Sequence, residues 1–276
     1  MTDNDYQNYL HEKHSKFNTA TELISKLVYK ATSTQPTSIE KVIQGEVNEV
    51  YKVTTENNQG IIVRISHSKK PRFETEQKYI NMCRENNVPA PEILLVERIS
   101  SDEGDKTFCI QKEIKGITFR ELVEQPNYDF KSKEHKKLLR QLGSILSKIH
   151  NIKVDTFGIL ADPDDQKPTW QEYLYQEIDN KERLYQVAEN IDLDSSVIDS
   201  AFDLIKKAEH FYKKVKPSLL HGDYGLKHML VENNIIVGVI DFEGCKGGDP
   251  VFDIAWLHYF YNKYVDLNLL IDGYEN

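Results

Sequence analysis

The chain has 276 residues, enough to bury a sizeable core and to divide into two lobes. No apolar run approaches the roughly 18 residues that a membrane span needs, and the net charge of −9 disfavours nucleic acid as a partner. The three cysteines are widely scattered and the N-terminus lacks a signal-peptide core. We therefore expect a cytoplasmic protein with reduced thiols and with neither a membrane nor a nucleic-acid partner.

The N-terminal part is patterned as a helical segment followed by strands. Apolar residues at three-to-four spacing mark a helix within the first 35 residues, and a break at 34–37 follows it. Strands are then expected at 39–43, 50–53 and 61–65, with Gly45 in the first loop and a turn at 57–60. A helix at 72–86 and strands at 92–96 and 107–114 complete this part. The first three strands therefore follow the order strand, glycine loop, strand, turn, strand.

Arg64 is a polar residue inside the apolar run 61–65. One interpretation is a side chain that points outward from an alternating strand. The other, implied by the family resemblance described below, is a cation that pairs with a Glu on the next helix. Glu76 falls on the apolar face of the 72–86 helix, whereas Glu74 points elsewhere. Because a carboxylate on a buried face needs a partner, we pair Glu76 with Arg64.

The C-terminal part is mainly helical. Helices are expected from Phe119 onward, at 130–152, near 169–189 and 195–214, and at 253–260. The apolar stripe of the 130–152 helix ends at His150, which we interpret as a packed, hydrogen-bonded core residue rather than a catalyst. The chain ends soon after the last of these helices.

The most informative stretch runs from His221 to Pro250. It contains His221-Gly222-Asp223, then His228, then Asp241, and the segment 231–240 between them is patterned as a hairpin. This spacing predicts that Asp223, His228 and Asp241 lie near one end of the hairpin. Phosphoryl transfer from a nucleotide needs one carboxylate that orients the attacking hydroxyl and two ligands for Mg²⁺. Each short segment alone reads as a polar turn, but their order and spacing favour this chemistry.

The stretch resembles the catalytic segment of the aminoglycoside phosphotransferase family, small-molecule relatives of the protein kinases. Their pattern is His-Gly-Asp, a metal-binding Asn, Ile-Asp-Phe or Ile-Asp-Trp, and Gly-Asp-Pro; this chain has Ile240-Asp241-Phe242 and Gly248-Asp249-Pro250. The resemblance covers roughly residues 38–260. It implies an α+β, two-lobed, protein-kinase-like fold. The N-terminal nucleotide-binding lobe, with an antiparallel sheet, would span 1–111, the linker 112–116, and the larger, mainly helical C-terminal lobe 117–276.

The resemblance also implies roles for individual residues. Asp223 would be the catalytic base, and His228 and Asp241 would ligate Mg²⁺. ATP or GTP would contact Gly45, Asn48, Arg64, Glu76, Gln111, Lys112 and Ile114, of which Lys112 and Ile114 lie in the linker. His221 would hold the catalytic loop and Asp249 would cap the turn that follows, with direct catalysis as their alternative role. Lys227 is either an exposed loop lysine or a contact of the γ-phosphate.

Three features depart from the family pattern. Arg64 stands where the family has Lys, His228 stands where most members have Asn, and members usually continue with more C-terminal helices, which suggests a short form or a truncated chain. Imidazole is a less natural Mg²⁺ ligand than oxygen. Glu243 stands where protein kinases have Gly, so it adds negative charge near the metal or the acceptor.

The expected activity is transfer of a γ-phosphoryl group to a hydroxyl of an aminoglycoside-type antibiotic, by a monomer. Residues 108–122, Phe157-Gly158 and Thr169-Trp170 are similar to hygromycin B phosphotransferases. A cationic acceptor would suit an acidic cleft, for which the candidates are Glu243, Glu172, Glu177 and Asp179. The alternatives are a metabolic kinase of a small alcohol (choline, homoserine or a thioribose) and an inactive nucleotide-binding pseudokinase. Retention of both Asp223 and Asp241 argues against the pseudokinase.

Overall fold

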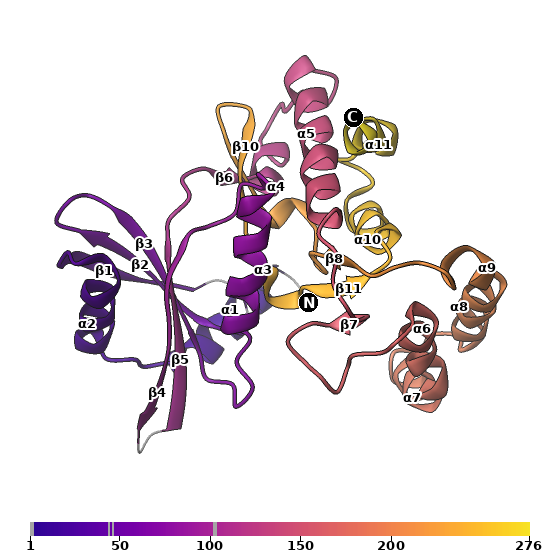
Figure 1. Ribbon diagram of the computed structural model, residues 1–276, viewed down its shortest axis with the longest axis horizontal. Coiled ribbons are helices and arrows are strands. Elements are labelled where there is room, and N and C mark those ends of the chain that lie inside the picture. The colour runs from indigo at the N-terminus through magenta and orange to yellow at the C-terminus, as the bar shows by residue number, and fades with distance from the viewer. Residues whose placement is uncertain (1–2, 44, 46, 102–103) are drawn as a thin grey trace. The chain divides into compact units, whose positions relative to one another are not determined.

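The computed structural model describes residues 3–43, 45, 47–101 and 104–276. The chain forms two compact units, and it passes between them several times (Figure 1). Unit 1 comprises Met1–Glu85, Pro89–Tyr128 and Lys227–Glu243, and unit 2 comprises Asn86–Val88, Asp129–Leu226 and Gly244–Asn276. The lobe limits at 111 and 117 stay a prediction. Within the described part of the chain, no helix is long and apolar enough to cross a membrane.

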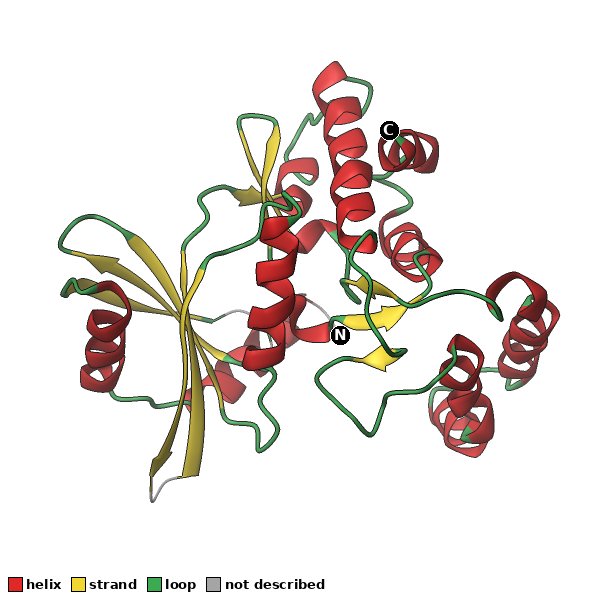
Figure 2. Ribbon diagram, viewed as in Figure 1, coloured by secondary structure: helices red, strands yellow, loops and turns green. Residues whose placement is uncertain are grey.

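Unit 1 is built around a five-stranded antiparallel sheet in the order β1-β2-β3-β5-β4 (Figure 2). Its elements in chain order are α1 (Asp3–Ser15), α2 (Thr21–Thr32), β1 (Pro36–Val42), β2 (Glu49–Thr55), β3 (Gly60–Ser66), α3 (Phe73–Glu85), β4 (Ile93–Ser101), β5 (Gly104–Lys112), β6 (Ile117–Thr118), α4 (Phe119–Val123), β9 (Met229–Glu232) and β10 (Ile235–Val239).

The two faces of this sheet pack against different helices. Successive side chains of a strand point to opposite faces. In β3, Ile61, Val63 and Ile65 join one apolar cluster with residues of α2. Arg64 lies on the other face and meets Glu76 of α3 at 2.7 Å. The predicted ion pair therefore forms, and the outward-pointing interpretation of Arg64 fails because α3 covers that face, leaving Arg64 only 9% exposed.

A second, three-stranded sheet of unit 1 has the order β10-β9-β6. Its β9–β10 hairpin turns at Asn233 and Asn234, which both adopt positive φ, a conformation that Asn tolerates. The predicted hairpin is confirmed. Gly116 has φ +139°, and a Cβ there would lie 2.9 Å from the Val231 carbonyl oxygen, so this approach to β9 requires glycine.

Unit 2 is mainly helical. Its elements are α5 (Lys133–His150), β7 (Gly158–Ile159), α6 (Trp170–Asp179), α7 (Lys181–Asn190), α8 (Ser196–Lys207), α9 (Glu209–Tyr212), β8 (Ser218–Leu220), β11 (Lys246–Gly248), α10 (Val251–Tyr261) and α11 (Leu267–Glu275). The strands form a small sheet, β7-β11-β8. Helices α5 and α11 run side by side (Figure 1) because Gly143 and Gly273 let their backbones meet. The sequence patterns did not predict α11.

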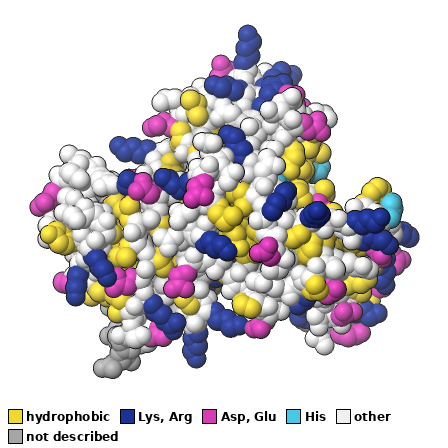
Figure 3. Space-filling view, viewed as in Figure 1, with side chains coloured by type: hydrophobic (Ala, Val, Ile, Leu, Met, Phe, Trp, Pro, Cys, Tyr) yellow, Lys and Arg dark blue, Asp and Glu magenta, His cyan; other side chains and the backbone are white. Residues whose placement is uncertain are grey.

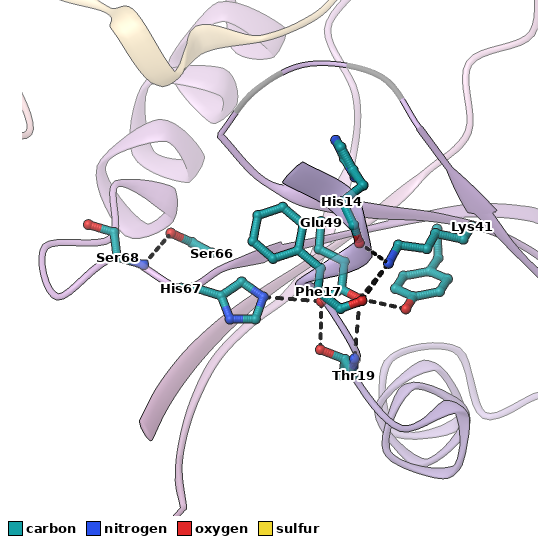
Figure 4. Close-up of polar contacts among 9 residues, drawn as sticks. His14, Phe17, Thr19, Lys41, Glu49, Ser66, His67 and Ser68 are labelled. Carbon is teal, nitrogen blue, oxygen red and sulfur yellow. Dashed lines mark hydrogen bonds and ion pairs between the residues drawn. The ribbon is translucent and has the colours of Figure 1, made fainter. Parts of the chain in front are cut away.

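A buried carboxylate ties the N-terminal segment to the sheet of unit 1 (Figure 4). Glu49, at the start of β2, is fully buried and accepts hydrogen bonds from the Thr19 amide (3.2 Å), the Thr19 hydroxyl (2.7 Å) and the Tyr51 hydroxyl (2.6 Å). His67 Nε2 lies 3.1 Å away and Lys41 Nζ 3.6 Å away. Burial raises the pKa of the Glu49 carboxyl, but these hydrogen bonds outweigh burial and hold it below its ordinary value.

Candidate active site

The β9–β10 hairpin brings His228 and Asp241 together. His228 precedes β9 and Asp241 follows β10, and the Ile240 amide donates to the His228 carbonyl oxygen at 3.0 Å. His228 Nε2 lies 3.3 Å from Asp241 Oδ2, and the Asp241 side chain is 45% exposed. Asp241 has φ +69°, a strained conformation for a non-glycine residue that recurs at functional sites. The two predicted metal ligands are therefore adjacent, and one of them is open to solvent.

Arg64 is the shared cation of three carboxylates in unit 1. Its Nη1 donates to Glu76 Oε1 at 2.7 Å, and its Nη2 lies 3.2 Å from Glu243 Oε2 and 3.6 Å from Asp241 Oδ1. The guanidinium also lies over the Phe73 ring, 5.0 Å from its centroid. Burial lowers the pKa of Arg64, but the charges of Glu76 and Asp241 outweigh burial and raise it. The two terminal nitrogens of the planar guanidinium thus contact different carboxylates. The ammonium of a lysine is a single point charge and cannot reproduce this geometry.

Asn48 connects the loop before β2 to this group. Its Nδ2 donates to Glu243 Oε2 at 2.7 Å. Asn48 Oδ1, Glu76 Oε2 and Gln111 Oε1 are buried without a hydrogen-bond partner in the described structure. Such orphaned polar atoms are costly and call for an explanation such as a bound ligand. Gly45, in the same loop, has φ +73°, which glycine adopts at no steric cost.

The predicted nucleotide contacts Gln111 and Lys112 are the last residues of β5, and Ile114 follows the strand. Lys112 uses its backbone N–H to bond the Glu92 carbonyl oxygen at 2.9 Å, and its ammonium lies 2.8 Å from the Glu92 carboxylate. That N–H is therefore already committed within unit 1. Gln111 is buried, and Ile114 packs where Gly238 leaves space, because a Cβ at Gly238 would lie 2.9 Å from the Ile114 side chain.

The donor set of unit 1 fits Mg²⁺ in part. Within the described residues, no group of three or more His, Cys, Asp and Glu could hold a metal. Mg²⁺ is commonly held by one or two carboxylates together with substrate phosphates and waters, so the exposed Asp241 carboxylate suits it. His228 offers a nitrogen beside Asp241, which is a weaker match. The protein alone supplies at most a partial site, as expected for a metal that arrives with a nucleotide.

In unit 2, the His221-Gly222-Asp223 segment follows β8. Gly222 has φ +84°, and a Cβ there would lie 2.2 Å from the Gly244 carbonyl oxygen, so only glycine fits. The Asp223 amide donates to His221 Nδ1 at 3.3 Å, in keeping with a structural role for His221. The Asp223 carboxylate accepts a hydrogen bond from the Trp256 indole at 2.9 Å.

Asp253, which sequence reasoning missed, holds this segment. Its Oδ2 accepts from the His221 amide at 2.8 Å, its Oδ1 accepts from the Gly222 amide at 3.0 Å, and His150 Nε2 lies 3.2 Å from Oδ2. Burial raises the pKa of the Asp253 carboxyl, but His150, His221 and the Gly222 amide outweigh burial and lower it. A charged residue in an otherwise apolar helix, directly after Gly-Asp-Pro, could have indicated that Asp253 is buried and needs partners.

Asp249 has a more local role than Asp253. Its Oδ1 accepts from the Val251 amide, two residues further on, at 3.0 Å, so it stabilises the turn that leads into α10, whose N-cap is Pro250. The helix begins at Val251, two residues before the expected Asp253, so Asp253 faces inward from its first turn.

The predicted site residues thus fall into two sets. Unit 1 brings together Asn48, Arg64, Glu76, His228 and Asp241, with Glu243 among them. Unit 2 holds Asp223, His221 and Asp249. The functional roles of both sets stay predictions. Of the residues expected to make an acidic cleft, Glu172 and Asp179 are exposed, and the side chain of Glu177 lies outside the described part.

Comparison with known proteins agrees with the motif. The sequence matches, over residues 38–271, the family described as "Phosphotransferase enzyme family" (APH). A search of curated proteins finds no match. The structure is similar to aminoglycoside phosphotransferase APH(4)-Ia (TM-score 0.66, 16% identity, 93% of this chain and 82% of that one). It is also similar to APH(2″)-IIa in its streptomycin–ATP complex (TM-score 0.57, 18% identity, 94% and 83%). These likenesses confirm the α+β kinase-like fold.

Proposed function

The chain belongs to the phosphotransferase enzyme family and is a small-molecule phosphotransferase, and we propose that it transfers the γ-phosphoryl group of ATP or GTP to a hydroxyl of an aminoglycoside-type antibiotic. The observation that carries the proposal is the group in unit 1, where the carboxylates of Glu76, Asp241 and Glu243 gather around the Arg64 guanidinium beside orphaned polar atoms. The His228 imidazole lies against the Asp241 carboxylate. A nucleotide triphosphate with its metal supplies the matching charges and hydrogen-bond partners.

Each set of residues has a part in the proposed reaction. Arg64, held by Glu76, binds the phosphates, and Asp241 with His228 holds Mg²⁺, which when bound would neutralise charge on the phosphate oxygens. Asp223 orients the acceptor hydroxyl. The oxygen of the acceptor hydroxyl forms a bond to the γ-phosphorus, while the bond from that phosphorus to the β–γ bridging oxygen breaks. The electron pair leaves with the nucleoside diphosphate, and the hydroxyl proton passes to Asp223.

The acceptor class is supported by similar proteins and by charge. Structures similar to this chain include APH(4)-Ia with ADP and hygromycin B (TM-score 0.63, 16% identity, 91% of this chain and 80% of that one). The net charge of −9 suits a polycation. On the face shown in Figure 3, however, acidic and basic side chains are interspersed, so this face offers no continuous acidic field.

The experiment that tests the proposal is a phosphorylation screen. The purified protein would be incubated with ATP or GTP and Mg²⁺ against hygromycin B, other aminoglycosides, a macrolide, choline and homoserine, with mass spectrometry of the products. We expect a phosphorylated aminoglycoside, and expression in a sensitive bacterium should raise aminoglycoside resistance and leave macrolide susceptibility unchanged. Phosphorylation of only a small metabolic alcohol would refute the antibiotic acceptor and favour the metabolic kinase. A protein that binds nucleotide and phosphorylates no compound would favour the pseudokinase.

A further inference from the structure

A tryptophan side chain contacts the proposed base. The Trp256 indole Nε1 donates a hydrogen bond to Asp223 Oδ1 at 2.9 Å. The indole is a donor without an acceptor, so this bond has one direction, and an ionised carboxylate is the strongest partner that it could find. A carboxylate otherwise rotates broadly about its last torsion. A directed bond to one of its oxygens restricts that rotation and thereby fixes the direction of the other oxygen.

The indole itself is held on both sides by neighbours one helical turn away in α10. Phe252 stacks with the Trp256 ring at 6.0 Å between centroids and 16° between planes, and Phe260 lies 4.7 Å away on the following turn. Residues four apart on a helix face each other in this way. Phe252 is in turn packed edge-on by Trp170, with centroids 6.2 Å apart. The donor of the hydrogen bond therefore has little freedom to turn away.

Helix α10 holds the catalytic segment at two points. Asp253 accepts from the backbone of His221 and Gly222, which fixes the main chain of the loop. Trp256, one turn further along the helix, fixes the side chain that the loop presents. Fixing the main chain does not by itself fix a side-chain rotamer, and a catalytic group must be held closely to its productive direction.

We infer that Trp256 is a positioning residue for the Asp223 carboxylate. Its contribution to turnover rests on the proposed function, because it acts through Asp223. The hydrogen bond itself does not rest on it and is measured without a substrate. The two parts can therefore fail separately.

The first test uses the fact that the chain has two tryptophans, Trp170 and Trp256. The full chain labelled with ¹⁵N should show two indole N–H signals, which Trp170→Phe and Trp256→Phe assign by their disappearance. We expect Asp223→Asn to move the Trp256 signal and to leave the Trp170 signal in place. A Trp256 signal that stays in place in Asp223→Asn would overturn the inference.

The second test is a double-mutant cycle in turnover, with ATP and hygromycin B, or with water as the acceptor if hygromycin B is not phosphorylated. Loss of a hydrogen bond to a charged group predicts that Trp256→Phe lowers kcat by about tenfold and leaves the KM for ATP unchanged. In the Asp223→Asn background the same substitution should have no further effect, because the group that it positions is gone.

Trp170→Phe is the matched control, since it makes the same exchange elsewhere in unit 2, retains an aromatic ring against Phe252, and keeps the bond from Trp256 to Asp223. We expect it to lower stability and to leave kcat nearly unchanged. Equal losses in kcat from Trp256→Phe in both backgrounds would overturn the positioning role. Near-normal turnover in Asp223→Asn would instead refute the catalytic assignment of the proposed function and the kinetic half of the inference, while the indole signal would still decide the hydrogen bond.

Discussion

The buried charges of unit 1 and unit 2 are satisfied to different degrees. In unit 2, both oxygens of Asp253 accept hydrogen bonds, and His150, which lies against one of them, bonds to the Tyr274 hydroxyl through its other nitrogen at 2.9 Å. In unit 1, Arg64 is surrounded by carboxylates, yet one oxygen of Glu76 remains buried without a partner in the described structure. The buried oxygens of the Asp253 group have their hydrogen-bond partners within the protein, whereas the Arg64 group contains a buried oxygen that can still accept a hydrogen bond.

Under the proposed function, the complete hydrogen-bond network of unit 2 is scaffold, and the incomplete group of unit 1 is the nucleotide-binding site. A closed hydrogen-bond network rigidifies the groups that it contacts, and the network around Asp253 contacts the backbone of His221 and Gly222. A group with excess negative charge and orphaned polar atoms is costly unless a ligand completes it. Substitutions in unit 2 should therefore act mainly on stability and turnover, whereas those in unit 1 should act on nucleotide binding as well.

The largest effect on stability is expected from Arg64→Ala. Removing the shared cation leaves the buried Glu76 carboxylate beside two others, which should cost about 3–5 kcal/mol in the free energy of unfolding. Glu76→Ala should cost less, because Arg64 keeps Glu243 and Asp241 as partners, and the double variant should be far from additive. Both should weaken ATP binding. Chemical denaturation and calorimetric titration measure these effects, and additive losses would show that the pair does not act together.

The Arg64→Ala variant should also respond to pH. Burial raises the pKa of the Glu76 carboxyl, and the charge of Arg64 opposes this rise. Without Arg64 the folded-state pKa lies further above the unfolded value, so the penalty is present at neutral pH and is relieved as pH falls through the raised pKa. The gap in melting temperature between wild type and variant should therefore narrow on mild acidification. A gap that widens would contradict the assignment.

Asp253→Asn should destabilise unit 2 by about 2–4 kcal/mol, because an amide cannot replace a carboxylate that accepts two backbone N–H groups and a histidine. The folded-state pKa of Asp253 is lowered, so its stabilisation is complete above the ordinary Asp pKa of 3.8 and is lost as pH falls through the folded value. Turnover should fall while ATP affinity is retained. Asp249→Asn, which keeps a side-chain oxygen for the Val251 amide, is the control and should change stability by less than about 1 kcal/mol.

For the metal, Asp241→Ala should weaken Mg²⁺-dependent ATP binding by about tenfold or more, since even indirect partners of a metal contribute this much. His228→Asn should retain activity because it offers the oxygen that Mg²⁺ prefers. Titration of Mg²⁺ against bound ATP measures both. An unchanged Mg²⁺ requirement in Asp241→Ala would remove that residue from the metal site.

The sequence was sufficient to predict those contacts of the site whose residues are marked by a local pattern. The β9–β10 hairpin carries its own turn residues and alternation, so the approach of His228 to Asp241 could be predicted. Arg64 and Glu76 could be paired because each was an isolated charge on an apolar face. In both cases the residues near each side chain in the sequence indicated where that side chain would lie.

The remaining features depend on distant contacts that leave no local pattern. In the sequence Asp253 is one more polar residue of a helix. Its role depends on the His221 and Gly222 amides, which follow β8 and donate to its carboxylate. The bond from Trp256 to Asp223 likewise joins segments with no common periodicity. The Glu49 carboxylate is buried by Thr19, which lies in a segment whose path the sequence does not indicate.

The smallest expected effect concerns Glu49, which tests whether a closed carboxylate network behaves alike in the two units. Hydrogen-bond donors of Thr19 and Tyr51 surround the Glu49 carboxylate, unlike the carboxylates around Arg64. In this respect Glu49 resembles Asp253. Glu49→Gln keeps the shape and loses the charge, so it should cost about 1–2 kcal/mol at neutral pH, the loss expected for hydrogen bonds to a charged acceptor.

The pH dependence decides the cause of that loss. The folded-state pKa of Glu49 is lowered, so its stabilisation is fully present above the ordinary Glu value of 4.5 and disappears as pH falls through the folded value. The advantage of wild type over Glu49→Gln should therefore be constant from neutral pH down to about 4.5 and shrink below it. Glu97→Gln, which breaks a partly exposed pair with Lys30, is the control and should change stability by less than about 1 kcal/mol. If the Glu49→Gln deficit persisted unchanged at pH 3, it would reflect packing rather than charge, and the likeness between Glu49 and Asp253 would fail.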